Sequence, residues 1–304
     1  MRRIGMEFGI GLPERARKTE PIARVSLGEV FAAESDTCCR PVIRDYNDAT
    51  MSNFRERTET GPIYVEGVKA GDMIRVNIRE LRNIGGATGA RRGGSVDYLP
   101  IDGGVIAYPG GFKTDVRMMI GVICVAPNFS DGEDYGDYLR YDLGDNGGNM
   151  DYRDVCAGNS ICFKARNDGG LLFLGDMHAY QGFGEWLGLG AECAGEAVIS
   201  VDIESRFSSD RPVIVKDRSM AFLASRWPLR DALDLAISDA VSALRRMTGA
   251  GESEARRFAL LTGSATHGQN AHLLRSDLPL TPGGAMPATV GFEIPTEYLG
   301  AMAP

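Results

Sequence analysis

An acid and a histidine two residues apart stand in the stretch GDMHAYQGFGE, residues 175–185. The apolar run GLLFLGD before them is typical of a strand. We therefore expect Asp176 and His178 at or just beyond the strand end, with both side chains on one face. A carboxylate and an imidazole are good ligands for zinc or a similar divalent ion. The alternative is an acid that orients a core histidine beside a glycine turn, and the pair taken alone favours that alternative.

A second polar cluster lies upstream in DLGDNGGNMDYRD, residues 142–154. A double glycine separates Asp145 from Asn149, Asp151 and Asp154 in a stretch too polar to be core. These residue types favour a solvated turn. They also offer oxygen ligands, although their spacing does not fit a helix-loop-helix calcium loop. Spacing alone leaves both interpretations open.

The elements that must position these clusters are mostly strands. Short apolar runs rich in Val and Ile are separated by Gly, Pro, Asn and Asp through most of the chain. In MIRVNIREL, Ile74, Val76 and Ile78 alternate with polar residues, which predicts one buried face. AVISVDI and ATVGFEIP have the same character. The regular spacing favours two packed antiparallel sheets, so we predict a mainly β fold with a β-sandwich core and appended α/β elements.

Helical patterns are confined to the later part of the chain. A helix is predicted to begin near Pro228 and to end by Gly249. Its apolar positions recur at helical spacing at Leu233, Ile237, Val241 and Leu244. A second helix is predicted after Gly251, capped by Ser253. This pair makes the fold α+β overall. We expect one compact unit over residues 1–304, with a subdivision near 205–225 as the alternative.

Composition and charge indicate which classes of binding partner the protein can have. The net charge of −8 and the pI near 5.1 would repel a phosphate backbone, which excludes a general nucleic-acid role and favours a small-molecule partner. Apolar runs stay well short of the roughly 20 residues that span a bilayer, so we expect a cytoplasmic protein without a membrane partner. Cys124 and Cys162 lie in apolar runs and are expected to be buried, reduced thiols.

Longer motifs then carry a resemblance. GGNMDYRDVCAGNSICF followed by GLLFLGDMHAYQGFGEWLGLGAE resembles the core of the acetamidase/formamidase family, whose pattern runs GGNxD, GDxHAxQGxGE and a later glutamate. TGPIYVEGVKAGDMIRVNI and GVICVAP resemble earlier family segments, in family order. The resemblance implies a β-sandwich core with α/β additions and metal-dependent hydrolysis of small amides to a carboxylate and ammonia. By position it singles out Asn149, Asp151, Asp176, His178, Gln181, Glu185 and Glu192.

Roles follow from side-chain chemistry. The expected metal ligands are Asp151, Asp176 and His178, with zinc as the expected ion and calcium or manganese as alternatives. The expected catalytic residues are Glu185, Glu192 and Gln181. One glutamate would take a proton from water and return it to the leaving ammonia. The side-chain amide of Gln181 would bind the substrate. The expected substrate-binding residues are Asn149, Tyr180 and Phe183. We expect a substrate of formamide or acetamide type and a homo-oligomer, as a dimer.

The chain also departs from the family pattern. Residues 41–62 lack the histidine and tryptophan that usually precede the TGP segment, and Phe183 stands where an acid is usual. His267 or His272 would replace a missing ligand, or would lie in a helix-to-loop connection. Two alternatives therefore remain: a non-catalytic or metal-binding protein that has kept the fold, and an amidase that uses Cys156 or Cys162 as nucleophile.

Overall fold

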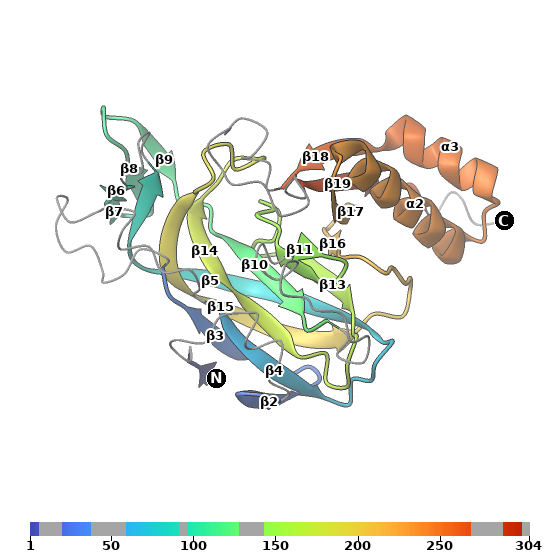
Figure 1. Cartoon of the computed structure of the whole chain (residues 1–304), viewed down its shortest axis with the longest axis horizontal. Coiled ribbons are helices and arrows are strands. Elements are labelled where there is room, and N and C mark those ends of the chain that lie inside the picture. The colour runs from blue at the N-terminus through green and yellow to red at the C-terminus, as the bar shows by residue number, and fades with distance from the viewer. Residues whose placement is uncertain (6–19, 38–58, 91–95, 128–142, 269–287, 300–304) are drawn as a thin grey trace.

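A computed structural model describes residues 1–5, 20–37, 59–90, 96–127, 143–268 and 288–299. These segments form a large curled β-sheet, a small three-stranded sheet at one end and two helices at the other (Figure 1). The mainly β prediction with a late helical pair is confirmed. The hydrogen-bonded ladder continues through 16 strands, so the two expected layers come from one sheet that curls over itself.

Most neighbouring strands of this sheet are antiparallel, and its main path runs β11-β12-β10-β14-β15-β5-β13-β16-β17-β19-β18. The remaining strands pair beside it. The strands of the large sheet are β1 (Arg2–Ile4), β2 (Ala23–Ser26), β3 (Phe31–Ser35), β4 (Thr60–Glu66), β5 (Met73–Ala90), β6 (Val96–Leu99), β10 (Met119–Val125), β11 (Leu143–Gly144), β12 (Gly147–Asn149), β13 (Ser160–Lys164), β14 (Leu172–Tyr180), β15 (Ala191–Ile203), β16 (Val213–Val215), β17 (Ser219–Arg226), β18 (Ser264–His267) and β19 (Ala288–Pro295).

Two long strands, β5 and β15, lie side by side in the middle of the sheet. Their antiparallel ladder runs from the pair Ile74 and Ile203 to the pair Thr88 and Glu192. The alternation expected in MIRVNIREL is observed, because Ile74, Val76 and Ile78 are all buried. The far end of β5 pairs with β6, which leads into the small sheet of β7 (Ile101–Asp102), β8 (Val105–Ala107) and β9 (Lys113–Asp115).

Both late helices form as predicted. Helix α2 (Leu229–Thr248) follows Pro228 and ends at Gly249, whose φ of 72° suits a glycine C-cap. Helix α3 is Glu252–Thr262 with Gly251 at its N-cap, so the predicted cap at Ser253 is wrong and that serine lies inside the first turn. The N-cap backbone is extended there and no side chain caps the helix.

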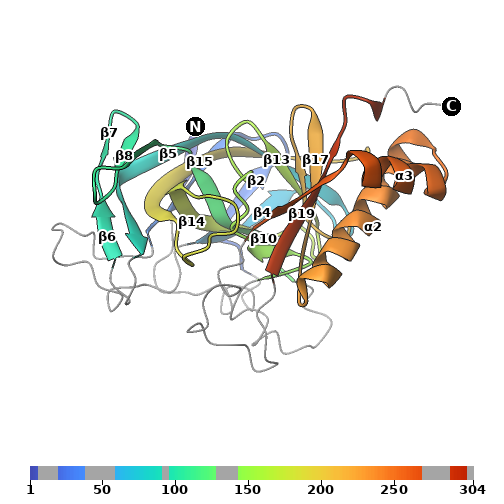
Figure 2. The same ribbon diagram turned by 90° about the horizontal axis from the view of Figure 1, so that it is seen from above.

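The helices cover one end of the large sheet, where α2 packs on β17 and β19 (Figure 2). The buried face of α2 is mostly alanine, which lets the helix approach the strands closely. Its buried residues are Ala232, Ala236, Ala240, Val241, Ala243, Leu244 and Thr248. The apolar side chains here form a cluster separate from the larger core inside the curled sheet. No helix in the described segments is long and apolar enough to cross a membrane.

Candidate functional site

Three adjacent strands bring the two polar clusters of the sequence together. β10 lies between β12 and β14, so that one β10 residue faces both Asn149 and Gly175. The chain continues to Asp151 on one side and to Asp176 on the other. A Cβ added to Gly121 of β10 would lie 2.6 Å from Asp151 Oδ1 and 2.7 Å from Asp176 Oδ2. Glycine at this position therefore leaves the room that the two carboxylates occupy.

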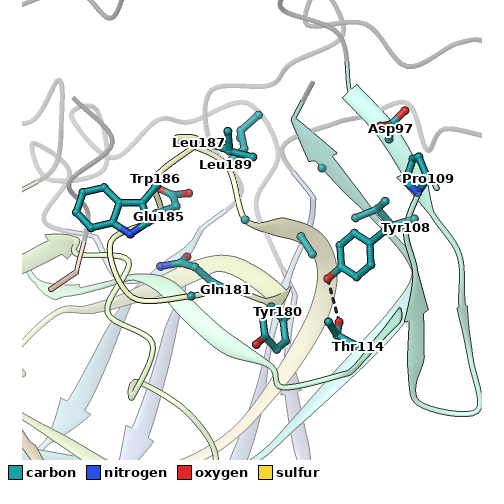
Figure 3. A pocket seen from close by; sticks show the side chains of 15 residues that line it. Asp97, Tyr108, Pro109, Thr114, Tyr180, Gln181, Glu185, Trp186, Leu187 and Leu189 are labelled. Atoms are coloured by element: carbon teal, nitrogen blue, oxygen red, sulfur yellow. Dashed lines mark hydrogen bonds between the residues drawn. The ribbon is translucent and has the colours of Figure 1, made fainter. Parts of the chain in front are cut away.

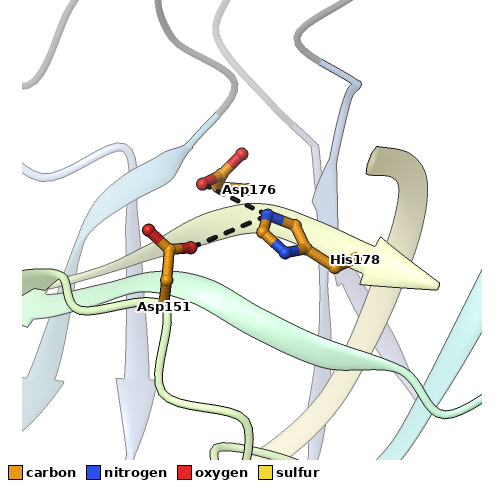
Figure 4. Close-up of side chains that lie close together, drawn as sticks. All are labelled: Asp151, Asp176 and His178. Atoms are coloured by element: carbon orange, nitrogen blue, oxygen red, sulfur yellow. Dashed lines mark ion pairs between the residues drawn. The ribbon is translucent and has the colours of Figure 1, made fainter. Parts of the chain in front are cut away.

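His178 completes this cluster. β14 continues through Asp176 and His178 to Tyr180, so the strand does not end where the sequence suggested. The imidazole is fully buried, and its Nε2 lies 3.7 Å from Asp151 Oδ1 and 3.6 Å from Asp176 Oδ2 (Figure 4). On β15, Glu192 Oε2 lies 3.0 Å from the same nitrogen. One imidazole nitrogen thus faces three carboxyl groups.

Gln181 determines which imidazole nitrogen carries hydrogen. The Nε2 of Gln181 donates to the backbone oxygen of Asp151 at 2.6 Å, which leaves the Gln181 side-chain oxygen to face His178 Nδ1 at 2.5 Å. Because that oxygen can only accept, Nδ1 of His178 carries the proton. In a neutral imidazole the lone pair then lies on Nε2, and it points toward carboxylates.

This arrangement requires a cation. Nε2 of His178 has no hydrogen-bond partner with adequate geometry among the described residues, although it is buried. A lone pair facing anions is unfavourable unless a proton or a metal ion lies between them. Burial opposes an imidazolium, yet the carboxylates of Glu192 and Asp176 raise the pKa of His178 well above its ordinary value. In the metal-free protein, a proton on His178 Nε2 would supply this positive charge.

The pKa values of the neighbouring carboxyl groups are also shifted by burial and by nearby charges. Burial, reinforced by neighbouring acids, raises the pKa of Asp151 to about 8, with His178 acting in the opposite direction. Burial and then the charge of Asp151 raise the pKa of Glu185 well above its usual range. Burial also raises the pKa of Glu192. Several acids crowded in a dry site cannot all ionise unless a cation neutralises them.

Backbone strain is concentrated at the same residues. In the described part of the chain, four residues other than glycine have positive φ, and three of them are Asp151 (42°), Asp176 (54°) and Glu185 (42°). Such conformations are costly for residues with a Cβ, and they persist where the surrounding structure imposes them. Here the strain turns carboxylates toward a common point.

The donor set fits a divalent cation. Asp151, Asp176 and His178 each offer one ligand atom, and these atoms lie within 4.8 Å of one another. His178, Glu185 and Glu192 form a second, overlapping group by the same measure. Imidazole nitrogen and carboxylate oxygen suit zinc, manganese and related ions. Gln181 accepts a hydrogen bond from Nδ1 of His178, the ring nitrogen that faces away from the carboxylates. A metal-ligating histidine commonly makes such a bond with its second nitrogen.

A cavity of about 410 Å³ adjoins this cluster (Figure 3). Gln181 and Glu185 line one side of it, and the opposite wall comes from β6 and the small sheet. The lining residues are Gly89, Asp97, Leu99, Tyr108, Pro109, Thr114, Tyr180, Gln181, Gly182, Glu185, Trp186, Leu187, Leu189, Gly190 and Ala191. A small molecule bound there would reach the buried acids through Glu185.

Of the three expected substrate-binding residues, the structure places one in the cavity lining and two elsewhere. Tyr180 lines the cavity. Asn149 ends β12, on the far side of β10 from β14. Phe183 does not contribute to the cavity lining; its ring packs edge-on against Tyr152 at 5.8 Å, and the Arg153 guanidinium lies 3.9 Å from its centroid. The aromatic ring at this position therefore consolidates the loop behind the cluster.

Other candidate residues lie away from the cluster. His267 lies on β18, in a strand where a helix-to-loop connection was expected, and its ring faces Trp186 at 6.3 Å. Cys124 and Cys162 are buried as predicted. Burial raises the thiol pKa of Cys162, and that of Cys156 as well. His272 and most of the segment 41–62 lie outside the described residues.

Sequence reasoning missed the wall formed by Leu99, Tyr108 and Thr114. Nothing in their local pattern distinguishes them from other short strands. Their role depends on how β6 to β9 fold back toward the loop after β14. Gly190 was also missed: a Cβ there would lie 2.4 Å from His178 Nδ1 and would displace the Gln181 contact.

Comparisons with known proteins agree with this geometry. Residues 143–230, which include both polar clusters, match the model of the Acetamidase/Formamidase family. Among solved structures, an acetamidase from Bacillus halodurans is 26% identical, with a TM-score of 0.82 over 99% of this chain and 100% of that chain. A recombinant predicted acetamidase/formamidase from Thermoanaerobacter tengcongensis is 25% identical, with a TM-score of 0.79 over 99% and 98%.

A more distant likeness supports the fold alone. An acetamidase from Yersinia enterocolitica is 21% identical, with a TM-score of 0.79 over 98% of this chain and 92% of that chain. No curated protein sequence matches the chain significantly.

Proposed function

The chain belongs to the acetamidase/formamidase family, and from this premise we propose that it is a metal-dependent amidase. It hydrolyses the amide of a small molecule to a carboxylate and ammonia. The expected substrates are small aliphatic amides of the formamide or acetamide type, which carry little beyond the amide group that reacts. The observation that supports the metal requirement is His178 Nε2, which is buried and lies 3.0 to 3.7 Å from carboxylate oxygens of Glu192, Asp176 and Asp151.

Asp151, Asp176 and His178 would hold the ion, with zinc as the first choice and manganese or calcium as alternatives. A divalent ion at such a site supplies Lewis-acid polarisation of a carbonyl and activation of water near neutral pH. Asp176 and His178 lie on β14, and Asp151 follows β12 on the other side of β10, where Gly121 lies between the acids.

Glu185 is the better candidate for the proton-transfer residue. Glu185 both belongs to the buried cluster and lines the cavity, whereas Glu192 does not line the cavity. Glu192 is also engaged on both oxygens: Oε1 accepts from the Gly190 N–H at 2.9 Å, and Oε2 faces His178. Glu185 would take a proton from the attacking water as the carbon–oxygen bond forms. It would return that proton to nitrogen as the carbon–nitrogen bond breaks.

Gln181 acts as a positioning residue in this proposal. The oxygen and the nitrogen of its side chain already bond within the protein, to His178 and to the Asp151 backbone. Neither group is therefore free to bind the substrate amide, which was the role expected from the sequence. Tyr180 forms part of the wall against which the substrate lies. Phe183 supports the loop that carries Asp151 through its contact with Tyr152, and neither Phe183 nor Asn149 is among the residues that line the cavity.

The cysteine alternative is weaker on physical grounds. A thiol nucleophile needs a depressed pKa, but burial raises the pKa of both Cys156 and Cys162. Lys164, the charged residue two positions after Cys162, pairs with Asp210 Oδ1 at 2.6 Å.

Ammonia release from short primary amides tests the proposal. The chelator-treated protein should be inactive, and Zn²⁺, Mn²⁺ or Ca²⁺ added singly should show which ion restores turnover. Full activity after complete metal removal would refute the metal requirement. Absence of turnover together with absence of metal binding would support the non-catalytic alternative. Loss of activity on thiol alkylation, but not on chelation, would support the cysteine alternative.

Cellular location and assembly complete the proposal. Cys156, Cys162 and Cys193 are free thiols, which suits a reducing cytoplasm. β18 ends the strand path of the large sheet, and an edge of this kind could pair across a dimer axis. A sizing measurement coupled to light scattering checks the dimer.

A further inference from the structure

The cavity beside the cluster is larger than the minimal substrates require. One water molecule accounts for roughly 30 Å³ of liquid, so acetamide, about four such units in size, would fill roughly 120 Å³. The cavity measures about 410 Å³. The cavity therefore has room for more than the reacting amide, and one of its walls comes from β6 and the small sheet.

The lining beyond Gln181 and Glu185 is mainly apolar or aromatic. Leu99, Tyr108, Pro109, Tyr180 and Leu189 provide this surface. Figure 3 shows Tyr108, Pro109 and Thr114 on the wall opposite Glu185 and Trp186, with Tyr180 between the two sides. The Tyr108 hydroxyl is engaged with Thr114 Oγ1 at 3.0 Å, so the Tyr108 ring offers its apolar body to the cavity.

Charge limits what can fill this space. Among the residues that the structure describes, the lining includes the acids Asp97 and Glu185 but no lysine, arginine or histidine. An amide that also carries an anionic carboxylate would therefore enter a negative region without a counter-charge from the described lining. An uncharged acyl group meets no such penalty.

We infer that the cavity is an acyl-group pocket, and that the preferred substrates are primary amides with a bulky, uncharged, apolar acyl group such as an aryl or branched alkyl chain. This inference rests on the proposed amidase function. Binding energy from the acyl group raises kcat/KM, since removal of a methylene from such a pocket commonly costs about 10-fold or more.

A substrate series tests the inference. The zinc-loaded protein should hydrolyse phenylacetamide with a kcat/KM at least about 10-fold above that for acetamide. Para-carboxyphenylacetamide should fall at least about 10-fold below phenylacetamide because of its charge. Acetamide turned over as well as or better than phenylacetamide would overturn the inference and leave the amidase function standing. No turnover of any amide would defeat the proposed function, and the inference with it.

A filled pocket provides the matched test. Thr114→Trp adds a large side chain on the wall opposite Glu185, and Lys113→Trp adds the same side chain on the exposed neighbouring position of β9. Thr114→Trp should lower kcat/KM for phenylacetamide about 10-fold or more and leave acetamide within about 2-fold, while Lys113→Trp should change neither. Equal losses for both substrates in Thr114→Trp would overturn the inference.

Binding to metal-free protein separates the pocket from the chemistry. By calorimetry, phenylacetamide should bind the metal-free protein more tightly than acetamide does, and Thr114→Trp should abolish that difference. Equal binding of the two amides by the unsubstituted protein would contradict an acyl-group pocket even if the amidase activity were established.

Discussion

The side-chain oxygen of Gln181 lies 2.5 Å from His178 Nδ1, and this contact places the imidazole lone pair on the nitrogen that faces the acids. Gln181 is held in that orientation because its nitrogen donates to the Asp151 backbone. The side-chain amide of Gln181 thus links two proposed metal ligands, His178 on β14 and Asp151 in the loop after β12. The metal affinity of the site should depend on a residue that does not touch the ion.

Gln181→Met tests this link. The substitution keeps the length of the side chain but removes both hydrogen bonds, so the imidazole loses the partner that fixes its tautomer. Metal affinity should fall by roughly 10- to 100-fold, as measured by competition with a chromophoric chelator. Gln181→Glu restores the acceptor for Nδ1 but not the donor to Asp151, so it should recover part of the loss. Unchanged affinity in Gln181→Met would show that the contact is not needed.

Gly121→Ala tests the space between the acids. Its methyl group would lie 2.6 Å from Asp151 Oδ1 and 2.8 Å from the Asp176 backbone oxygen, so at least one ligand must move. Overpacking of this kind costs about 1–3 kcal/mol, and we expect metal affinity to fall at least about 10-fold. Gly182→Ala is the matched control, because a Cβ there meets nothing within 4 Å. Equal affinity in the two variants would contradict the assigned geometry.

Stabilisation by metal should increase with pH. Burial raises the pKa of Asp151 from 3.8 to about 8, so between these values the folded metal-free protein binds more protons than the unfolded chain. Its stability therefore falls as pH rises across this range. A divalent ion that replaces the proton removes this loss, so the rise in Tm on adding Zn²⁺ should be larger at about pH 8 than at about pH 6. An increase in Tm that is equal at both pH values would argue against metal binding at Asp151.

A half-buried ion triad should stabilise the region beside Asp151. Lys216 Nζ donates to Asp154 and, at 2.8 Å, to Glu293 Oε2, which joins the loop after β12 to β19. Burial opposes the ammonium charge, but these carboxylates raise the pKa of Lys216. Lys216→Met should lower the free energy of unfolding by about 1–3 kcal/mol in denaturant titrations. Lys113→Met, at an exposed position, should change it by less than about 0.5 kcal/mol.

The sequence predicted the strands best where burial is one-sided. Ile74, Val76 and Ile78 alternate in the sequence and lie in the core, because a strand with one buried face must place every second side chain there. Helix α2 was predictable from its period and from Pro228 and Gly249. Its buried alanines were not the emphasised positions, because close approach of the helix to β17 and β19 favours small side chains.

The candidate site was predictable in residue type but not in geometry. Asp176 and His178 converge because they share β14, a local relationship that spacing can express. Asp151 joins them only through β10, which lies between the two segments and leaves room at Gly121. The Gln181 contact depends on the irregular register after His178. Relationships of this kind depend on strand pairing, which a single sequence does not specify.

The most direct test of the account is a zinc titration of metal-free protein in which bound metal and ammonia release from one primary amide are measured in the same samples, with His178→Ala alongside. We expect activity to rise in proportion to bound metal, to saturate at a single ion per chain, and to be lost together with tight binding in His178→Ala. Full activity before any metal is added, or undiminished activity in His178→Ala, would contradict it.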